Sequence, residues 1–397
     1  LIVGILLAAG LTYVEPATKA LTLDISRVIG NLFLNALKAV ALPLVVVTLI
    51  AGIGNLNQRL GRLGALAISF YGLSTLLAVL VGLLVANVMA PGLHAIAPAG
   101  GWLASAGSAG ALPALASPSW ADSVLATLFK AASEGNLLAL VLFALLVGMA
   151  IRTLPESLRE VQRQFWDGLQ QVLLTLVLWL LKAAPIGVAA LVCNSASQMG
   201  WAALQPLAWF MATVIIGLLL HAVVSLGLVL WQLARVSPRD HARAMSPALW
   251  MAFSTASSTA TLPLTLRCLN ERAGVDPGVT SLTVPLGATL NMDGTALYEC
   301  VAVLFLAQLL GFDLSLADQV VVVALSLATS IGMAGIPAAS LVAIALILQR
   351  LGMPAEALGL LLITDRPLDM CRTAVNVWSD SVAARMVARF AQNRVSI

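Results

Sequence analysis

The chain has 397 residues, of which 60% are hydrophobic and only 10% are charged, and its mean hydropathy is +0.99. Soluble globular proteins carry about 25% charged residues, so this composition excludes an ordinary water-soluble protein and predicts a polytopic membrane protein. The formal net charge of +3 is too small to indicate nucleic-acid binding. The four cysteines and three histidines are scattered, without the spacing of a metal site or a disulfide framework.

Apolar runs long enough to cross a bilayer as helices recur along the whole chain. They predict an all-α protein with eight transmembrane helices, near residues 1–14, 28–54, 63–89, 122–152, 166–194, 205–234, 276–311 and 355–391. Segment 92–121 is rich in Ala, Gly, Pro and Ser, and we expect a long extracellular or periplasmic loop there. Because the chain begins at Leu1 inside an apolar run, we expect its native start to lie upstream.

Arginines follow every second helix, which predicts the orientation of the chain. The connections 92–121, 195–204 and 312–318 contain no Lys or Arg. The alternate junctions and the C-terminal end carry Arg59, Arg62, Arg152, Arg159, Arg163, Arg235, Arg239, Arg243, Arg385, Arg389 and Arg394. Since Lys and Arg accumulate in cytoplasmic loops, we expect these junctions and the C-terminus to be cytoplasmic, in an inner (plasma) membrane.

Two segments interrupted by polar residues, 240–272 and 316–350, are expected to be re-entrant helical hairpins. The first has the polar run 254–259 (STASST) at its centre, and a single helix there would end on the wrong side for the next one. Two arms of roughly 12 residues reach about 18 Å, a little over half of the bilayer core. The second repeats this plan from the opposite face with its tip at 329–337, so the two units form an inverted pair, as in secondary transporters. Kinked helices whose hydroxyls bond to their own carbonyls are the alternative.

The last predicted helix carries a stripe of charged residues, with Arg366 beside it. At 100° per residue, one face about 80° wide holds Asp365, Asp369, Arg372, Asn376 and Asp380. Each charge costs at least roughly 2.5–3.5 kcal/mol at the bilayer centre, which favours a function over a structural ion-pair network such as Asp365 with Arg366. Arg372 can bind a carboxylate through two hydrogen bonds and Asp369 can accept an ammonium, so the stripe indicates an amino acid with a second carboxylate.

The preceding helix, 276–311, is expected to be unwound at 291–295 (NMDGT), because Asn, Asp and Gly occur together in mid-span. Carbonyl and carboxylate oxygens in such a turn suit a hard cation, and sodium and a proton both fit. Glu299 is a lone acid in an apolar run. It is either a proton carrier or a glutamate with an unseen partner.

Four motifs, in order, resemble the dicarboxylate/amino acid:cation symporter family, which includes the glutamate transporters. They are 257–263 (SSTATLP), 291–295 (NMDGT), 334–337 (AGIP) and 369–373 (DMCRT) with Asn376 and Val377. The resemblance covers essentially the whole chain. It implies a homotrimer in the lipid bilayer. Scaffold helices in 1–62 and 122–200 would hold a transport domain, 63–91 and 201–397 with both hairpins, that moves like an elevator.

The resemblance also implies roles for individual residues. Substrate would contact Ser257, Ser258, Met292, Thr295, Ile336, Asp369, Arg372, Thr373 and Asn376. Sodium ions would contact Tyr71, Ser74, Thr75, Gly287, Thr289, Asn291, Asp293, Ser330, Ile331, Met333, Asn376 and Asp380. Glu299 resembles the proton-carrying glutamate of the animal transporters. Arg366 would supply a supporting charge, as in some bacterial members.

The chain departs from the family pattern at several positions. Ala256 stands where archaeal members have an arginine, and Met333, Ser340 and Trp378–Ser379 replace smaller or different residues, which affects the expected lid and second sodium site. Asp380 is an acid that proton-driven bacterial relatives tend to lose, so its presence favours sodium.

We therefore expect a secondary symporter of L-glutamate or L-aspartate, driven by sodium alone or by sodium with protons, with no organic cofactor and no enzymatic activity. The alternatives on the same fold are a proton-coupled carrier and a transporter of C4-dicarboxylates or neutral amino acids. A channel is a different class, as is an intramembrane aspartyl protease using Asp293 and Asp369, for which Arg372 would be superfluous.

Overall fold

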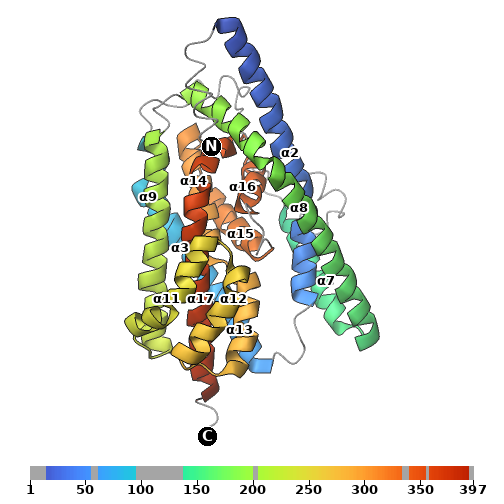
Figure 1. Cartoon of the computed structure of the whole chain (residues 1–397), viewed down its shortest axis with the longest axis vertical. Helices are drawn as coiled ribbons and strands as arrows, with labels where there is room; N and C mark the ends of the chain where they lie inside the picture. Colours follow the sequence, from blue (N-terminus) through green and yellow to red (C-terminus); the bar gives the residue numbers. More distant parts are fainter. Residues whose placement is uncertain are drawn as a thin grey trace.

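The computed structural model describes residues 15–54, 61–94, 137–199, 204–332, 339–354 and 357–392, and every regular element within these ranges is a helix (Figure 1). This confirms the all-α class. Three stretches of the described chain are long and apolar enough to cross a membrane, namely Leu63–His94, Gln205–Leu233 and Pro277–Leu310. The expected helix 1–14, residues 95–121 of the expected loop, and hairpin-tip residues 333–337 lie outside the described residues.

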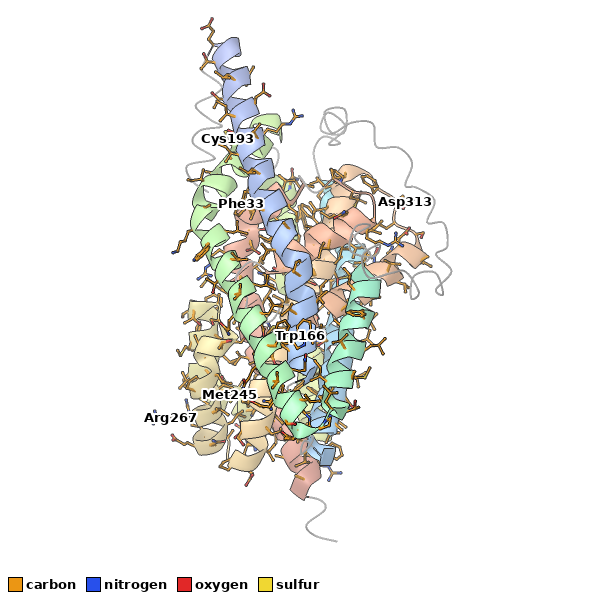
Figure 2. All side chains as sticks on the ribbon, turned by 90° about the vertical axis from the view of Figure 1, so that its right-hand side faces the viewer. Phe33, Trp166, Cys193, Met245, Arg267 and Asp313 are labelled. Carbon is orange, nitrogen blue, oxygen red and sulfur yellow. The ribbon has the colours of Figure 1, made fainter. Side chains whose placement is uncertain are left out.

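Three helices pack against one another along one side of the molecule: α2 (Pro16–Gly54), α7 (Leu137–Thr153) and α8 (Glu156–Met199) (Figures 1 and 2). Helices α2 and α8 approach closely at Gly187, where a Cβ atom would lie 2.4 Å from Cγ of Phe33. Both helices begin earlier than the apolar runs predict, at 16 rather than 28 and at 156 rather than 166. Charged pairs one turn apart, such as Arg159 with Glu156 at 2.9 Å, are compatible with a helix that continues beyond its apolar span.

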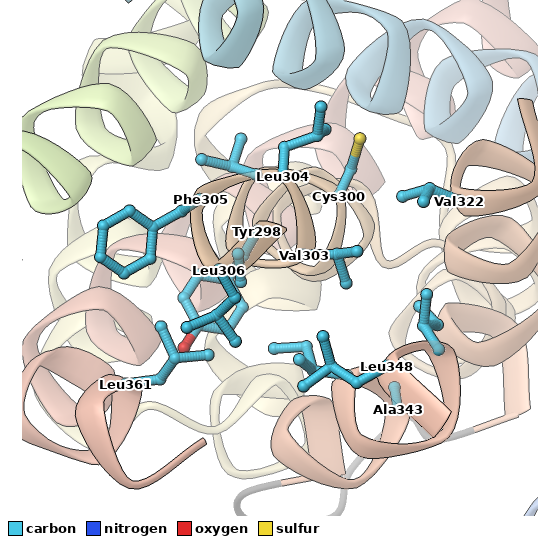
Figure 3. Close-up of a cluster of buried hydrophobic side chains, with 14 of the residues drawn as sticks. Tyr298, Cys300, Val303, Leu304, Phe305, Leu306, Val322, Ala343, Leu348 and Leu361 are labelled. Carbon is cyan, nitrogen blue, oxygen red and sulfur yellow. The ribbon is translucent and has the colours of Figure 1, made fainter. Parts of the chain in front are cut away.

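Helix α14 (Asp293–Leu310) lies at the centre of the other helices, which include α3 (Gly61–Met89), α9 (Leu204–Leu220) and α17 (Leu358–Gln392). Nearly all of its side chains are buried. Figure 3 shows α14 side chains pointing outward in all directions, toward Val322, Leu348 and Leu361 of neighbouring helices. A helix that is apolar all round belongs in a protein core or across a membrane, and the contacts of α14 with α3, α9 and α17, and with the helices that carry Val322 and Leu348, place it in the core.

The first expected hairpin is present as α11 (Pro238–Thr255) and α12 (Ser258–Arg267), which lie side by side in the lower half of Figure 1. The chain reverses at Ala256, which has the left-handed conformation (φ 50°, ψ 42°), and Ser257 caps α12 by accepting from the amide of Ala260. Ser254 bonds back to the carbonyl of Trp250, as the kinked-helix alternative requires. The reversal at Ala256 nevertheless favours the hairpin.

The second hairpin comprises α15 (Leu316–Gly332) and α16 (Ala339–Arg350), which contact each other and lie in the opposite half of the molecule (Figure 1). This placement agrees with the expected inverted pair. Further helical elements are the short turns η3 (Pro91–His94) and η7 (Cys268–Arg272), and α13 (Pro277–Leu290), which precedes α14.

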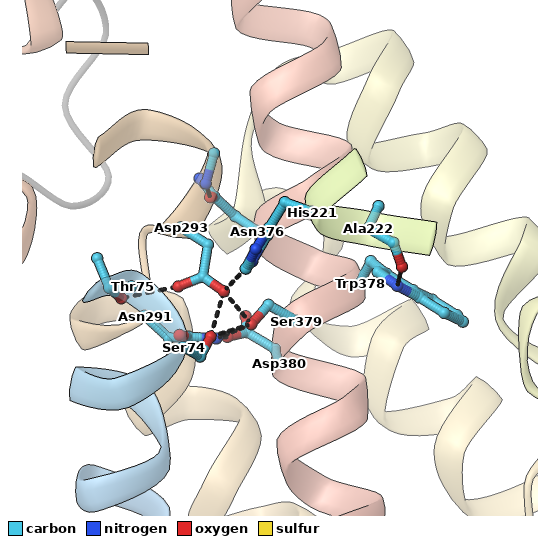
Figure 4. Close-up of polar contacts among 11 residues, drawn as sticks. Ser74, Thr75, His221, Ala222, Asn291, Asp293, Asn376, Trp378, Ser379 and Asp380 are labelled. Carbon is cyan, nitrogen blue, oxygen red and sulfur yellow. Dashed lines mark hydrogen bonds and ion pairs between the residues drawn. The ribbon is translucent and has the colours of Figure 1, made fainter. Parts of the chain in front are cut away.

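Helix α9 continues along the expected span 205–234 in a modified form. It passes into two π-helical turns, η5 (His221–Ser225) and η6 (Val229–Leu233), separated by the short α10 (Leu226–Leu228). The indole nitrogen of Trp378 on α17 donates to the carbonyl of Ala222 at 3.1 Å (Figure 4). A π turn widens the helix, and such turns are frequent at functional sites.

Candidate functional site

The expected break in the helix 276–311 is present. Helix α13 ends at Leu290 and α14 begins at Asp293, and between them Asn291 (φ −108°, ψ 82°) and Met292 (φ −111°, ψ 51°) are not helical. The amide of Gly294, left without a helical partner at the start of α14, donates to Oδ1 of Asn376 at 2.8 Å. The break is therefore stabilised by a side chain of the charged helix α17.

Arg372 of α17 is only 2% exposed, and both terminal nitrogens of its guanidinium have partners, whereas Nε has none among the described residues. Its Nη2 donates to Oδ1 of Asp365 at 3.1 Å and to Oδ1 of Asp369 at 3.0 Å. Its Nη1 donates to Oγ of Ser340 on α16 at 2.8 Å, and its Cζ lies 3.9 Å from the ring centre of Tyr298. The two carboxylates hold the arginine in place, and the aromatic face adds a favourable cation–π contact.

The pairing considered for Asp365 and Arg366 is wrong. The Arg366 side chain is 68% exposed, and its Nη1 lies 3.9 Å from Oδ2 of Asp369, whereas Asp365 pairs with Arg372. Along the helix, Asp365 and Arg372 are seven residues apart and share a face, whereas the adjacent Arg366 points about 100° away.

Three of the expected substrate residues are in contact with one another. The amide nitrogen of Asn376 donates to Sδ of Met292 at 3.2 Å and to Oγ1 of Thr295 at 3.3 Å. A Cβ atom at Gly294 would lie 2.6 Å from the carbonyl oxygen of Arg372, so glycine allows the start of α14 to lie directly on α17. The broken helix and the charged stripe therefore meet at Arg372 and Asn376.

The remaining expected substrate residues have different positions. Thr373 is buried on α17, next to Arg372. Ser257 and Ser258 stand at the turn of the first hairpin, whose two helices both contact α17. Ile336 lies outside the described residues.

Asp293 is the centre of a buried cluster of polar side chains from four parts of the chain (Figure 4). Its Oδ1 accepts from Thr75 of α3 at 2.7 Å. Its Oδ2 accepts from Ser379 of α17 at 2.6 Å, from Ser74 of α3, and faces Nε2 of His221 at 2.9 Å. Ser74 and Thr75 are thus brought to Asp293, as expected for a cation site.

A second buried carboxylate, Asp380, lies beside this cluster. The amide nitrogen of Asn291 donates to Asp380 Oδ1 and to Ser379 Oγ, both at 2.9 Å. A Cβ atom at Gly287 would lie 2.4 Å from Asp380 Oδ1 and 3.3 Å from the hydroxyl of Tyr71. Oδ1 of Asn291 is buried without a hydrogen-bond partner among the described residues. Two carboxylates and an unpaired amide oxygen are the ligand type that a hard cation such as sodium prefers.

The other expected sodium residues form no comparable cluster in the described part of the chain. The hydroxyls of Thr289 and Ser330 donate within their own helices, to the carbonyls of Leu286 and Leu327. Ile331 belongs to α15, and Met333 lies outside the described residues.

The sequence profile of the sodium:dicarboxylate symporter family matches residues 1–390. The chain belongs to this family. Members of the sodium:dicarboxylate symporter family are membrane-embedded transporters, so the protein is a transporter and not an enzyme, and the protease alternative is wrong.

The names of three relatives state what those proteins transport. The chain is 30% identical to the proton/glutamate-aspartate symporter of Escherichia coli, over 98% of this chain and 91% of that protein. It is 30% identical to excitatory amino acid transporter 3 of Mus musculus, over 92% and 79% respectively. It is 33% identical to neutral amino acid transporter B(0) of Oryctolagus cuniculus, over 95% and 76%. The relatives thus differ in the substrates that their names state.

Glu299 of this symporter is fully buried on α14 and has a partner. The hydroxyl of Thr329 on α15 lies 2.6 Å from Oε2, while Oε1 has no partner among the described residues. A hydroxyl carries no charge, so it does not neutralise the carboxylate. Both interpretations of Glu299 therefore stay predictions. Thr329 is the partner that the structural interpretation requires, and Oε1 is the free oxygen that a proton carrier requires.

Sequence reasoning missed several contacts of the site. His221 is one of three scattered histidines without the spacing of a metal site, but a histidine inside an apolar span is itself a signal of function. Ser340 and Ser379 were noted only as departures from the family pattern, and they contact Arg372 and Asp293. The contact of Tyr298 with Arg372 is not predictable from the sequence, because an aromatic residue in an apolar run is typical of a hydrophobic core.

Proposed function

We propose that this protein is a secondary active symporter of the acidic amino acids L-glutamate and L-aspartate, driven by a sodium gradient, with protons as an additional coupling ion. The observation that carries the proposal is a buried Arg372 that shares a helix face with Asp369 and Asn376, where Asn376 accepts from the amide of Gly294, the residue after Asp293. The names of the relatives, which include a glutamate-aspartate symporter, support it.

The charges around Arg372 suggest how the substrate binds. The guanidinium of Arg372 faces the two carboxylates of Asp365 and Asp369, and the exposed Arg366 lies 3.9 Å from Asp369, so both carboxylates are paired with arginine without substrate. A glutamate or aspartate molecule brings an ammonium, an α-carboxylate and a side-chain carboxylate. We propose that the substrate ammonium binds Asp369, whose side chain is 25% exposed, and that the side-chain carboxylate of the substrate replaces Asp369 as a partner of Arg372. The ammonium and the side-chain carboxylate of the substrate then each have a charged partner, which avoids leaving either of them unpaired in the site.

The link between substrate and cation sites runs through the broken helix. Asn376 holds the amide of Gly294 and the side chain of Thr295, and Asn291 holds Asp380 and Ser379. A cation bound by Asp293 and Asp380 would therefore fix the backbone at 291–294, and that backbone positions Asn376 beside Arg372. A ligand that favours one arrangement of these residues raises the affinity for the other ligand, which is the thermodynamic basis of coupling.

We also propose the architecture that the family pattern implies. Helices in 1–62 and 122–200 would form a scaffold, and 63–91 with 201–397 would form a transport domain that moves as an elevator in a homotrimer. The packing of α2, α7 and α8 on one side, away from the Asp293 cluster, is compatible with this division. Placement in the inner membrane with a cytoplasmic C-terminus follows from the arginine distribution.

Uptake of labelled aspartate and glutamate into proteoliposomes tests the proposal directly. We expect accumulation with an inward sodium gradient and little uptake without any gradient; a proton gradient should add to the sodium effect. Equal uptake under sodium, proton and null gradients would refute ion coupling and would favour a channel. A competitor panel that includes succinate and serine distinguishes acidic amino acids from C4-dicarboxylates and neutral amino acids, the alternative substrates on this fold.

Glu299→Gln is expected to flatten the pH dependence of sodium-driven glutamate uptake. Glutamine can retain the contact with Thr329 but cannot bind or release a proton, so a proton-coupled step that uses Glu299 becomes insensitive to pH. The measurement is the initial uptake rate at fixed sodium between about pH 5.5 and 8.5, a range that brackets the usual proton-coupling region. Thr329→Val, which removes the partner and keeps the acid, is the matched control and should keep a pH-dependent profile. A wild-type profile in Glu299→Gln would assign Glu299 a purely structural role.

A further inference from the structure

His221 occupies a special position beside the cation cluster. It begins the π-helical turn that continues α9, it is fully buried, and its Nε2 lies 2.9 Å from Oδ2 of Asp293 (Figure 4). Its other ring nitrogen, Nδ1, has no hydrogen-bond partner among the described residues. The indole of Trp378 binds the carbonyl of the next residue, Ala222, and so holds the widened turn against α17. The imidazole is thereby aimed at Asp293 and at no other described partner.

The hydrogen bonds to Asp293 are concentrated on one of its oxygens. A carboxylate oxygen has about two lone-pair positions, and here Ser74, Ser379 and His221 all contact Oδ2, whereas Oδ1 accepts only from Thr75. An ionised carboxylate only accepts hydrogen bonds, so the imidazole Nε2 carries the hydrogen in this contact. Three of the four partners are hydroxyls, and the fourth is a ring N–H.

This difference in partner type matters for cation binding. A hydroxyl can turn its hydrogen away and offer its oxygen to a cation, so Ser74, Thr75 and Ser379 are compatible with both states of the site. An imidazole N–H offers only a hydrogen, and a ring nitrogen suits softer metals than sodium. A cation that binds Oδ2 of Asp293 therefore competes with the N–H of His221 for this oxygen, whereas the hydroxyls can turn to accommodate it.

From this geometry we infer that His221 determines the cation affinity of the Asp293 site, because its Nε2–H and a sodium ion compete for the same carboxylate oxygen. The inference rests on the proposed cation site at Asp293 and adds a residue that neither the motifs nor the family pattern contained. In the cation-free state the imidazole satisfies Oδ2. A sodium ion at Oδ2 weakens or replaces this contact, and Nδ1 makes no second hydrogen bond among the described residues that would hold the ring on its far side.

Substitution of His221 separates this role from a packing role. His221→Phe keeps a ring of similar volume and removes the donor, whereas His221→Gln replaces the ring by an amide that can still donate to Asp293. Thr213→Val is the matched control, because Thr213 is buried two turns earlier on α9 and bonds only to the carbonyl of Trp209 in its own helix. If His221→Phe cannot be purified as a monodisperse protein, His221→Leu removes the same donor.

Sodium binding is measured on the full-length purified protein in detergent, without substrate, from the melting temperature and tryptophan fluorescence during a NaCl titration balanced with choline chloride. A ligand that binds only the folded protein raises its melting temperature according to its affinity, so this readout does not depend on transport. His221→Phe should melt lower than the wild type without sodium and reach half of its sodium response at about tenfold lower concentration, as expected for the loss of one charge-assisted competitor bond. His221→Gln and Thr213→Val should respond as the wild type does.

The outcomes separate this inference from the proposed sodium coupling. If His221→Phe responds to sodium and the wild type does not, His221 excludes sodium, and the inference stands while sodium coupling of the wild type fails. If both respond and the variant responds at lower sodium, both stand. A donor-free variant whose midpoint equals or exceeds that of the wild type, or that shows no sodium response at all, overturns the competition between His221 and the cation.

Discussion

Replacing Arg372 with alanine is expected to abolish uptake of glutamate and aspartate. The guanidinium is the buried cation of the charged stripe, and it is held by Asp365, Asp369 and Ser340 in a geometry that suits a carboxylate. Removing one partner of a buried, hydrogen-bonded charge pair costs about 2–5 kcal/mol, which corresponds to roughly a 30- to several-thousand-fold loss of affinity. The measurement is labelled aspartate and glutamate uptake into proteoliposomes under a sodium gradient.

Two comparisons show whether this loss reflects the substrate or the fold. Arg366→Ala removes the neighbouring arginine, whose side chain is 68% exposed, and it should reduce uptake far less than Arg372→Ala does. A serine or alanine molecule has no side-chain carboxylate, so a folded Arg372→Ala protein loses no contact with such a substrate. One relative is named a neutral amino acid transporter, so uptake of neutral amino acids is a reasonable second readout. Unchanged glutamate uptake in Arg372→Ala would disprove the proposed role of this residue.

The features of the fold that follow from hydrophobicity and turn chemistry could be read from the sequence. The reversal after Ser254 and Thr255 and the unwound turn at Asn291 are present, because polar residues in mid-span leave few other solutions in a membrane. The predicted ends of the helices agree less well with the structure. Helix α8 begins at Glu156, ten residues before the apolar run suggests, because hydropathy reports the membrane span and charged residues continue the helix beyond it.

Contacts between residues on one helix face could be predicted from the sequence, whereas contacts between segments that are distant in the sequence could not. The shared face of Asp369, Arg372 and Asn376 follows from helical geometry alone. The contact of Asp365 with Arg372 follows from the same geometry but was outweighed by the adjacent Arg366. His221 lies at the start of a π turn where α9 packs on α14 and α17, and hydrophobic periodicity does not predict such a turn. Tertiary packing therefore supplied the residue on which the cation competition depends.

Gly287→Ala is expected to impair the cation site at Asp380 and thereby sodium-driven uptake. The added Cβ would lie 2.4 Å from Oδ1 and 2.8 Å from Cγ of Asp380, so the carboxylate or the end of α13 has to move. The same Oδ1 accepts from Asn291, whose position defines the helix break. Overpacking a buried site costs about 1–3 kcal/mol, which would lower the apparent sodium affinity about 5- to 150-fold. The sodium dependence of aspartate uptake measures this change.

Gly72→Ala is the matched control, since Gly72 follows Tyr71 on α3 and a Cβ there meets nothing within 4 Å. It makes the same chemical change near the same cluster without crowding Asp380, so its sodium dependence should be that of the wild type. A general effect of alanine on helix stability would appear in both variants as a change in melting temperature without sodium. If Gly287→Ala kept wild-type sodium dependence, Asp380 would not contact the coupling cation. Asp293 would then be the acid at which sodium acts, since it is joined to Asp380 only through Ser379 and Asn291.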